Sequence, residues 1–187
     1  MKWIGDRISF VDTKEKATFV IYPPKIGWKI YVMYVWSALW ILVGFAVISQ
    51  LFLDYTEKEK ITLIIFLSFW LYFAVRVIRA LIFLIASREF ILIDDNGLHI
   101  KKATGKFGKS KRYFLENISK MRIPEVKENS FQAVYDSSPW VRGSDAIMFD
   151  YLGKTISFGR KLTEKDAKLL FNILVKKTDS AVRKKKK

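Results

Sequence analysis

The chain has no cysteine and only one histidine among its 187 residues. The absence of cysteine excludes a disulfide framework, a thiolate zinc site and a cysteine nucleophile. A single histidine argues against a histidine-based metal site and against a nucleophile activated by histidine. The sequence motifs of α/β-hydrolases, zinc proteases, P-loop enzymes and dinucleotide-binding folds are also missing. We therefore predict a protein that is not an enzyme, with no catalytic residues, no metal ligands and no cofactor.

Charged residues are scarce in residues 30–86, although they make up 27% of the chain. Within that window they lie at Asp54, Glu57, Lys58, Glu59, Lys60, Arg76 and Arg79. This segregation of charged from apolar residues is typical of a chain with membrane spans.

The first predicted span is residues 30–53, which carry no formal charge. A helix rises about 1.5 Å per residue, so roughly 20 apolar residues cross a hydrocarbon core of ~30 Å. A helix buried in a soluble protein would show a polar stripe with a period of 3.6 residues, and this segment shows none. We interpret it as a transmembrane helix.

The second predicted span, residues 61–86, is long enough to cross the membrane but contains Arg76 and Arg79. These arginines lie about 22 and 27 Å along a helix that begins at Ile61, within reach of the inner headgroups. They are three residues apart and share one helix face. Either they anchor the helix by binding lipid phosphate, or they form an intramembrane interface with an acidic partner.

The charges on either side of the spans predict the topology. Residues 54–60 can only join the two helices as a short hairpin loop, and they hold three acids and two bases. Residues 1–29 hold six bases and three acids, and residues 88–187 hold 23 bases and 12 acids. Because basic flanks stay in the cytoplasm, we expect both termini inside and the loop outside, in a bacterial inner membrane. The first 29 residues contain no signal-peptide core, so the first span is predicted to be a retained anchor.

After Arg88 the pattern changes to short runs with strand periodicity, separated by turn signals such as Asp95-Asn96-Gly97. A helix follows from Thr163, with apolar residues along one face. A bent sheet or barrel plugged by this helix is the natural packing. The seven predicted strands are residues 89–93, 98–101, 111–115, 118–124, 131–135, 146–150 and 155–159.

This order of elements resembles the pleckstrin-homology (PH) superfold, and in particular the bacterial PH-like domains that follow a pair of membrane helices. The resemblance covers residues 30–177 and rests on the two spans and on four segments: EFILIDDNGLHI, YFLENISKMRI, DYLGKTISF and LTEKDAKLLFNIL. It implies an α+β membrane protein, in which a transmembrane hairpin precedes a PH-like seven-stranded sheet or barrel with a C-terminal helix. It also implies a binding or assembly module without chemistry of its own.

Four regions follow from these observations. Residues 1–29 form a cytoplasmic segment with a hairpin predicted from residues 7–11 and 17–22, which either extends the cytoplasmic sheet or lies on the membrane. The other predicted regions are the transmembrane hairpin (30–87), the PH-like domain (88–177) and a polybasic tail (178–187).

Two basic clusters are candidates for binding lipid or another anion. The first contains Lys101, Lys102, Lys106, Lys109, Lys111 and Arg112, with two glycines that allow tight turns. The spacing of these cations is similar to that in the basic strand pair that binds phosphoinositides in eukaryotic PH domains. Here, however, the cluster comes after a first hairpin, which is a different place in the topology. The alternative is a solvated loop that obeys the positive-inside rule. The second cluster consists of Lys184, Lys185, Lys186 and Lys187.

The basic C-terminus has three readings. It can hold the tail on an anionic membrane surface, contact ribosomal or other RNA, or serve as a solubilising tail. Trp140, beside Arg142 in a loop with Ser137-Ser138-Pro139, is a candidate protein-interface anchor, or else it caps the core.

Three hypotheses of function follow. The first is an accessory or scaffold subunit of an inner-membrane complex that acts through a protein partner. The second is a membrane-surface module that binds anionic phospholipid. The third is a membrane factor that contacts the ribosome or RNA.

Overall fold

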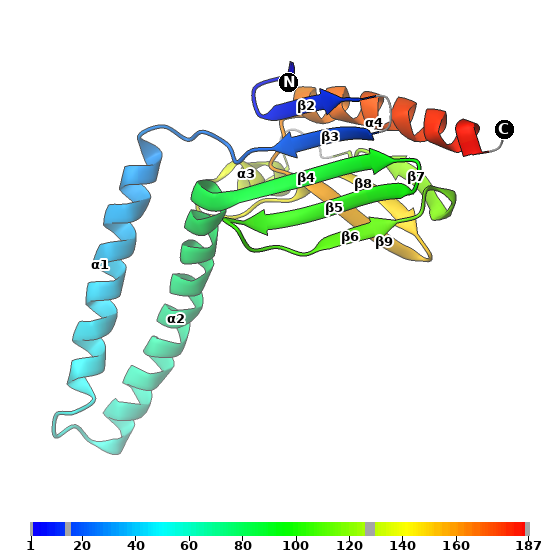
Figure 1. Cartoon of the computed structure of the whole chain (residues 1–187). Coiled ribbons are helices and arrows are strands. Elements are labelled where there is room, and N and C mark those ends of the chain that lie inside the picture. The colour runs from blue at the N-terminus through cyan, green and yellow to red at the C-terminus, as the bar shows by residue number, and fades with distance from the viewer. Residues whose placement is uncertain (1, 14–15, 126–129, 186–187) are drawn as a thin grey trace. The chain divides into compact units, whose positions relative to one another are not determined.

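The computed structural model describes residues 2–13, 16–125 and 130–185, with side chains up to Ala181. The chain divides into two compact units. Unit 1 comprises Met1–Pro24, Phe83–Ser138 and Arg142–Lys187, and unit 2 comprises Lys25–Ile82 and Pro139–Val141. Figure 1 traces the elements of both units along the chain.

The larger sheet of unit 1 has six strands in the order β1-β2-β3-β4-β5-β6, and every neighbouring pair is antiparallel. Its strands are β1 (Lys2–Ile4), β2 (Ile8–Asp12), β3 (Lys16–Ile21), β4 (Ser87–Asp94), β5 (Gly97–Thr104) and β6 (Ser110–Tyr113). The predicted N-terminal hairpin is confirmed, and it joins the domain sheet because β3 pairs with β4 along its whole length.

The pairing of β3 with β4 means that unit 2 is inserted between two neighbouring strands. Ile21, at the end of β3, lies opposite Glu89 at the start of β4. Because the two strands are antiparallel, the chain leaves the sheet and returns to it at the same end. The insertion therefore has the geometry of a hairpin.

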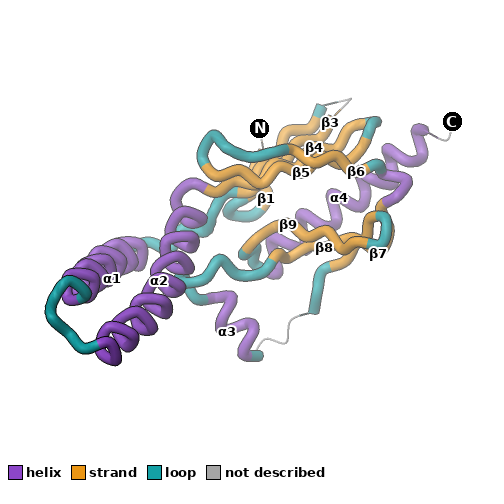
Figure 2. Tube along the Cα trace, turned by 90° about the horizontal axis from the view of Figure 1, so that it is seen from below, coloured by secondary structure: helices purple, strands orange, loops and turns teal. Residues whose placement is uncertain are grey.

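The second sheet has three antiparallel strands, β7 (Ile118–Arg122), β8 (Asp145–Tyr151) and β9 (Lys154–Arg160). Helix α4 (Glu164–Lys185) contacts both sheets, and Figure 2 shows it lying between them. Its predicted apolar face is confirmed, since Leu170 and Leu174 are fully buried. They pack in one core with Phe19, Phe149 and Phe158, which are also fully buried.

One predicted strand is wrong. Residues 131–135 are not extended but belong to helix α3 (Phe131–Ser137). The physical reason is an N-cap, because the Ser130 hydroxyl accepts a hydrogen bond from the backbone N–H of Ala133 at 3.2 Å. The described residues between 88 and 177 thus hold six strands rather than seven, together with a short 3₁₀ turn, Leu115–Asn117. The C-terminal helix also runs through residues 178–185, which were predicted as a separate tail.

Unit 2 contains the two helices that are long and apolar enough to cross a membrane, α1 (Lys29–Gln50) and most of α2 (Glu57–Ala86). They are held together by reciprocal hydrogen bonds. The Trp70 indole donates to the Trp40 carbonyl at 2.8 Å, and the Trp40 indole donates to the Trp70 carbonyl at 3.3 Å. Gly44 permits this contact, since a Cβ there would lie 2.1 Å from the Trp70 ring.

Candidate functional site

The most informative region is the end of unit 1 where residues 83–86, the last turn of α2, continue into β4 without a loop. We call it the α2 end. We call the opposite end, which carries the β4–β5 turn of residues 94–97, the far end. The strand register places the β5–β6 turn at the α2 end, because Thr104 lies opposite Ser87. Figure 1 shows β5 ending beside the last turn of α2.

The β5–β6 turn, residues 105–109, is fixed to helix α2 by its backbone. The Gly105 N–H donates to the Ala86 carbonyl, the last in α2, at 2.8 Å. Gly105 has φ +61°, a conformation that favours glycine. At Gly108 a Cβ would lie 2.6 Å from the Lys102 carbonyl oxygen, so only glycine lets the turn fold back onto β5. The two glycines and the α2 carbonyl therefore set the place of this turn.

The tip of this turn is apolar and flanked by cations. Phe107 is 85% exposed. Lys106 and Lys109 on either side are exposed and form no ion pair within the described part of the chain. Ile85, in the adjacent turn of α2, is 53% exposed. An exposed aromatic residue flanked by lysines is a combination that also occurs where proteins bind the interface of an anionic membrane.

The structure separates the six cations of residues 101–112. Lys106 and Lys109 lie in the turn at the α2 end, whereas Arg112 lies opposite His99 and donates to the Asn96 carbonyl at the far end. Lys111 is exposed on β6.

The two remaining cations of this cluster have partners inside unit 1. Lys102 forms an ion pair with Asp145 at 2.8 Å, and the Lys101 ammonium lies 5.9 Å from the Phe90 ring centre. The loop is therefore not one anion-binding site, and only its turn leaves cations at the α2 end for another partner.

The C-terminal lysines belong to another region of unit 1. Helix α4 begins after Thr163 at the α2 end, and by Lys177 it reaches Asp12 at the far end. Only the backbone is described for Lys184 and Lys185, and Lys186 and Lys187 lie outside the described residues. The described start of the second cluster thus lies toward the far end, away from Lys106 and Lys109.

Arg76 and Arg79 both lie on the exposed face of α2, whereas Ala74, Val77 and Ala80 form its buried stripe. The Arg76 guanidinium donates to the Tyr72 hydroxyl at 3.0 Å and lies over the same ring. Both side chains are exposed, so this face of α2 is open to lipid or to another subunit.

Trp140 does not cap the core of unit 1. It is half-buried and belongs to unit 2, where its ring packs edge-on against Trp36 of α1 with 5.0 Å between centroids. Arg142, two residues later, is exposed and belongs to unit 1. The pair therefore does not form the single exposed anchor that the sequence suggested.

A buried polar cluster at the α2 end was not predicted. Arg7 is only 8% exposed, and its guanidinium donates to the carbonyls of Tyr22, Arg160 and Lys161. Burial lowers the pKa of Arg7, while the carboxylates of Asp166 and Glu89 favour its charged form. The cluster ties the N-terminal strands to β9 and α4, so its role is structural.

The cluster has two further supports. Glu89 accepts a hydrogen bond from the Gly159 N–H at 2.7 Å. Asp166 packs against Gly5, where an added Cβ would overlap its carboxylate. Both carboxylates are almost fully buried.

Asp145 joins the two sheets beside this cluster. Its carboxylate accepts hydrogen bonds from Lys102 at 2.8 Å, Ser157 at 2.8 Å and Arg160 at 3.1 Å. Burial by itself would raise the pKa of Asp145, but the charges of Lys102 and Arg160 outweigh it and hold the pKa below its ordinary value. This carboxylate therefore stays ionised and paired, without a catalytic partner among the described residues.

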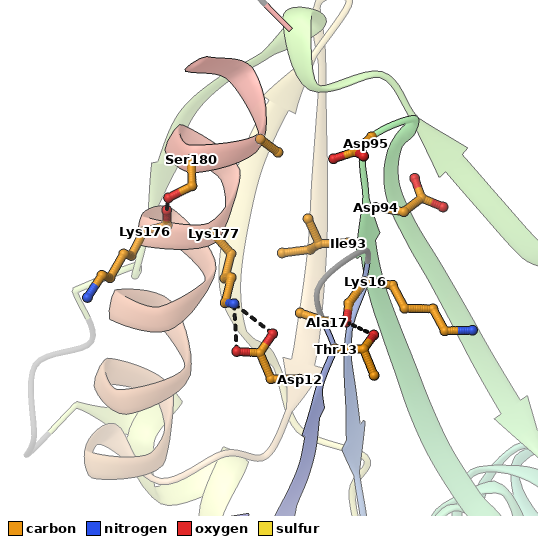
Figure 3. A pocket seen from close by; sticks show the side chains of 11 residues that line it. Asp12, Thr13, Lys16, Ala17, Ile93, Asp94, Asp95, Lys176, Lys177 and Ser180 are labelled. Atoms are coloured by element: carbon orange, nitrogen blue, oxygen red, sulfur yellow. Dashed lines mark hydrogen bonds and ion pairs between the residues drawn. The ribbon is translucent and has the colours of Figure 1, made fainter. Parts of the chain in front are cut away.

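The far end contains a pocket of about 230 Å³ between α4, β3 and the β4–β5 turn. Figure 3 shows Lys177 and Asp12 facing each other across it, while Lys176 points away. The Lys177 ammonium lies 2.6 Å from the Asp12 carboxylate. The pocket is also lined by Ala17 and Ile93. Its lining contains as many acidic as basic residues, so it favours neither an anionic nor a cationic ligand.

In comparisons with known proteins, no family model and no curated protein sequence matches the chain. The resemblance to PH-like domains therefore stays a prediction. The α+β architecture with two apolar helices and two sheets is what the structure shows.

Proposed function

We propose that this protein is a non-enzymatic, membrane-anchored accessory or scaffold subunit of a bacterial inner-membrane complex. In this proposal α1 and α2 span the membrane, and unit 1 is a PH-like module on the cytoplasmic side. The observation that carries it is the direct continuation of α2 into β4, because a folded domain is built onto the end of an apolar helix.

The distribution of charge supports the orientation. The sheet of unit 1 contains both the N-terminal strands and the strands after α2, so one side of the membrane would carry both basic flanks. The loop between the helices would lie outside. In this loop Thr56 caps the start of α2. The backbone N–H and the hydroxyl of Thr56 donate hydrogen bonds to the Glu59 carboxylate at 2.8 and 2.7 Å.

Arg76 and Arg79 support a protein partner within the membrane. An arginine inside a span is costly, and such residues usually face a bundle interior or a water-filled cavity, or reach the headgroups. On this chain they lie on the face of α2 that α1 leaves uncovered. We expect this exposed basic face to pack against an acidic or hydroxyl-bearing helix of another subunit.

Affinity purification from membranes in mild detergent tests this proposal. We expect the wild-type chain to recover a stoichiometric partner, and the double variant Arg76→Leu/Arg79→Leu to lose most of it. The matched control is Lys58→Leu/Lys60→Leu, which removes two cations from the other end of the same helix. Unchanged recovery from the arginine variant would assign these residues to lipid anchoring, and purification of the chain alone would overturn the accessory role.

A further inference from the structure

We propose that the β5–β6 turn is a membrane-insertion finger that places Phe107 in the lipid interface and binds anionic phospholipid headgroups through Lys106 and Lys109. This inference rests on the proposed function, because it requires α2 to span a bilayer. The occupant we assign to this surface is the lipid bilayer, and three observations support that choice.

The first observation is continuity with the spanning helix. The Gly105 N–H binds the last carbonyl of α2, so the turn begins where that helix ends. If the hydrocarbon starts at Ile61, about 20 residues of helix cross it by Ala80. Ala86 then lies about 9 Å further along the helix, at the outer edge of the headgroup layer. The turn that binds Ala86 is therefore placed within reach of lipid headgroups.

The second observation is exposure. Phe107 is the most exposed large apolar side chain among the described residues, at 85%, and Ile85 beside the same helix end is 53% exposed. Phe19, Phe149 and Phe158 of unit 1 are fully buried, whereas Phe131 in α3 is exposed at 83% but has no lysine on either side. An exposed aromatic ring is stable at a membrane interface because the ring leaves water while its backbone stays hydrated.

The third observation is charge. Lys106 and Lys109 are exposed on both sides of Phe107, and the acidic residue nearest in sequence after the turn is Glu116. Lysine ammoniums near an anionic leaflet strengthen surface binding, and the attraction is screened by salt. The neighbouring Lys102 is already neutralised by Asp145, so the turn supplies the cations that remain at this site.

Because the chain has no cysteine, a single introduced cysteine can be labelled specifically, and this allows a direct test. The full chain carrying Phe107→Cys is labelled with an environment-sensitive fluorophore and reconstituted in vesicles of equal parts phosphatidylglycerol and phosphatidylcholine. The matched control is Leu152→Cys, which is 70% exposed in the β8–β9 turn away from the α2 end. Spin-labelled lipids then report which probe touches the bilayer.

We expect the probe at residue 107 to be blue-shifted and quenched by headgroup-level spin labels, and the probe at residue 152 to behave as in water. Lys106→Glu, or vesicles of phosphatidylcholine alone, should shift the residue-107 emission back toward the residue-152 value. Lys154→Glu, a charge reversal beside Leu152, should leave the residue-107 emission unchanged.

A third probe separates the failure of this inference from the failure of the proposed function. Phe45→Cys, in the C-terminal half of α1 and 65% exposed, should be quenched by spin labels on the lipid acyl chains if the helices span the bilayer. Quenching at 45 with a water-like signal at 107 would overturn the insertion finger alone. Shielding of residue 107 in native membranes but not in pure lipid would overturn it in favour of a protein partner. Loss of quenching at 45 would overturn both proposals.

Discussion

The two units place the same kinds of side chain in opposite environments. In unit 1 Phe19, Phe149 and Phe158 are fully buried, whereas in unit 2 Phe45 and Phe69 are 65% and 64% exposed. A water-soluble domain buries apolar side chains in its core, whereas a membrane helix exposes them to the surrounding lipid. Unit 2 therefore has its apolar surface outside, and in unit 1 Phe107 and Phe131 share this exposure.

The largest expected effect concerns the buried cluster that holds unit 1 together. Arg7→Leu removes a guanidinium that binds three carbonyls and leaves Glu89 and Asp166 buried without their cation. Leaving buried charges without their compensating cation in this way costs about 3–5 kcal/mol. We expect a large loss of unfolding free energy, measured by urea titration followed by circular dichroism of the full chain in mild detergent.

The control for this variant is Lys154→Leu, since Lys154 is exposed at the start of β9. If both variants unfolded at the same urea concentration, the cluster would not be what joins the N-terminal strands to the rest of unit 1.

The next largest effect is expected in the helical hairpin of unit 2. Gly44→Leu places a side chain where the Trp70 ring lies, so the reciprocal indole bonds between Trp40 and Trp70 should be lost. Overpacking of this kind costs about 1–3 kcal/mol. We expect a weaker near-ultraviolet circular dichroism signal from the tryptophans and a lower thermal midpoint in detergent.

Ala46→Leu is the matched control for the hairpin, because Ala46 lies on the exposed face of α1. An equal change from both substitutions would show that close packing at Gly44 does not hold the helices together.

Acid should weaken unit 1 through Asp145. Its folded pKa lies below the ordinary value of about 3.9, so the unfolded chain binds more protons between the two values. The stability contributed by its ion pairs is present above about pH 4 and is lost as the pH falls through the folded pKa. Urea titrations at descending pH should show this loss.

Asp145→Asn removes the titrating group. The variant should be less stable than the wild type near neutral pH, and its stability should fall less steeply in acid. A wild-type slope retained in the variant would mean that other carboxylates, not Asp145, set the acid response.

The smallest effect is expected at the far end. Asp12→Asn removes the charge that pairs with Lys177 across the pocket, but both side chains are partly exposed. Such pairs contribute about 0–1 kcal/mol. Urea titration should detect little change. A loss as large as that of Arg7→Leu would show that the pocket, rather than the α2 end, fastens α4 to the sheet.

Much of the architecture could be predicted from sequence because its signals are local. The two long apolar helices, the turn at Asn96-Gly97 and the apolar face of α4 all arise from neighbouring residues. Helix α3 could not be predicted, because its apolar residues also fit a strand and the Ser130 cap is a weak signal.

The functional geometry depended on contacts between distant residues. Arg7 lies near Glu89 and Asp166 only in the folded unit 1, because these residues are far apart in the sequence. The sequence showed that the segment around Lys106 and Lys109 is basic, but not that its turn binds the end of α2. A charge pattern predicts which surface is basic, whereas the position of that surface depends on strand register.

The most direct test of the central claim, two helices in a bilayer with unit 1 on the inner side, is cysteine accessibility in spheroplasts. Tyr55→Cys lies in the short loop before α2, and Leu152→Cys lies in unit 1. We predict that a membrane-impermeant maleimide labels position 55 in intact spheroplasts and position 152 only after lysis. Labelling of position 152 before lysis, or recovery of the chain in the aqueous fraction, would contradict the account.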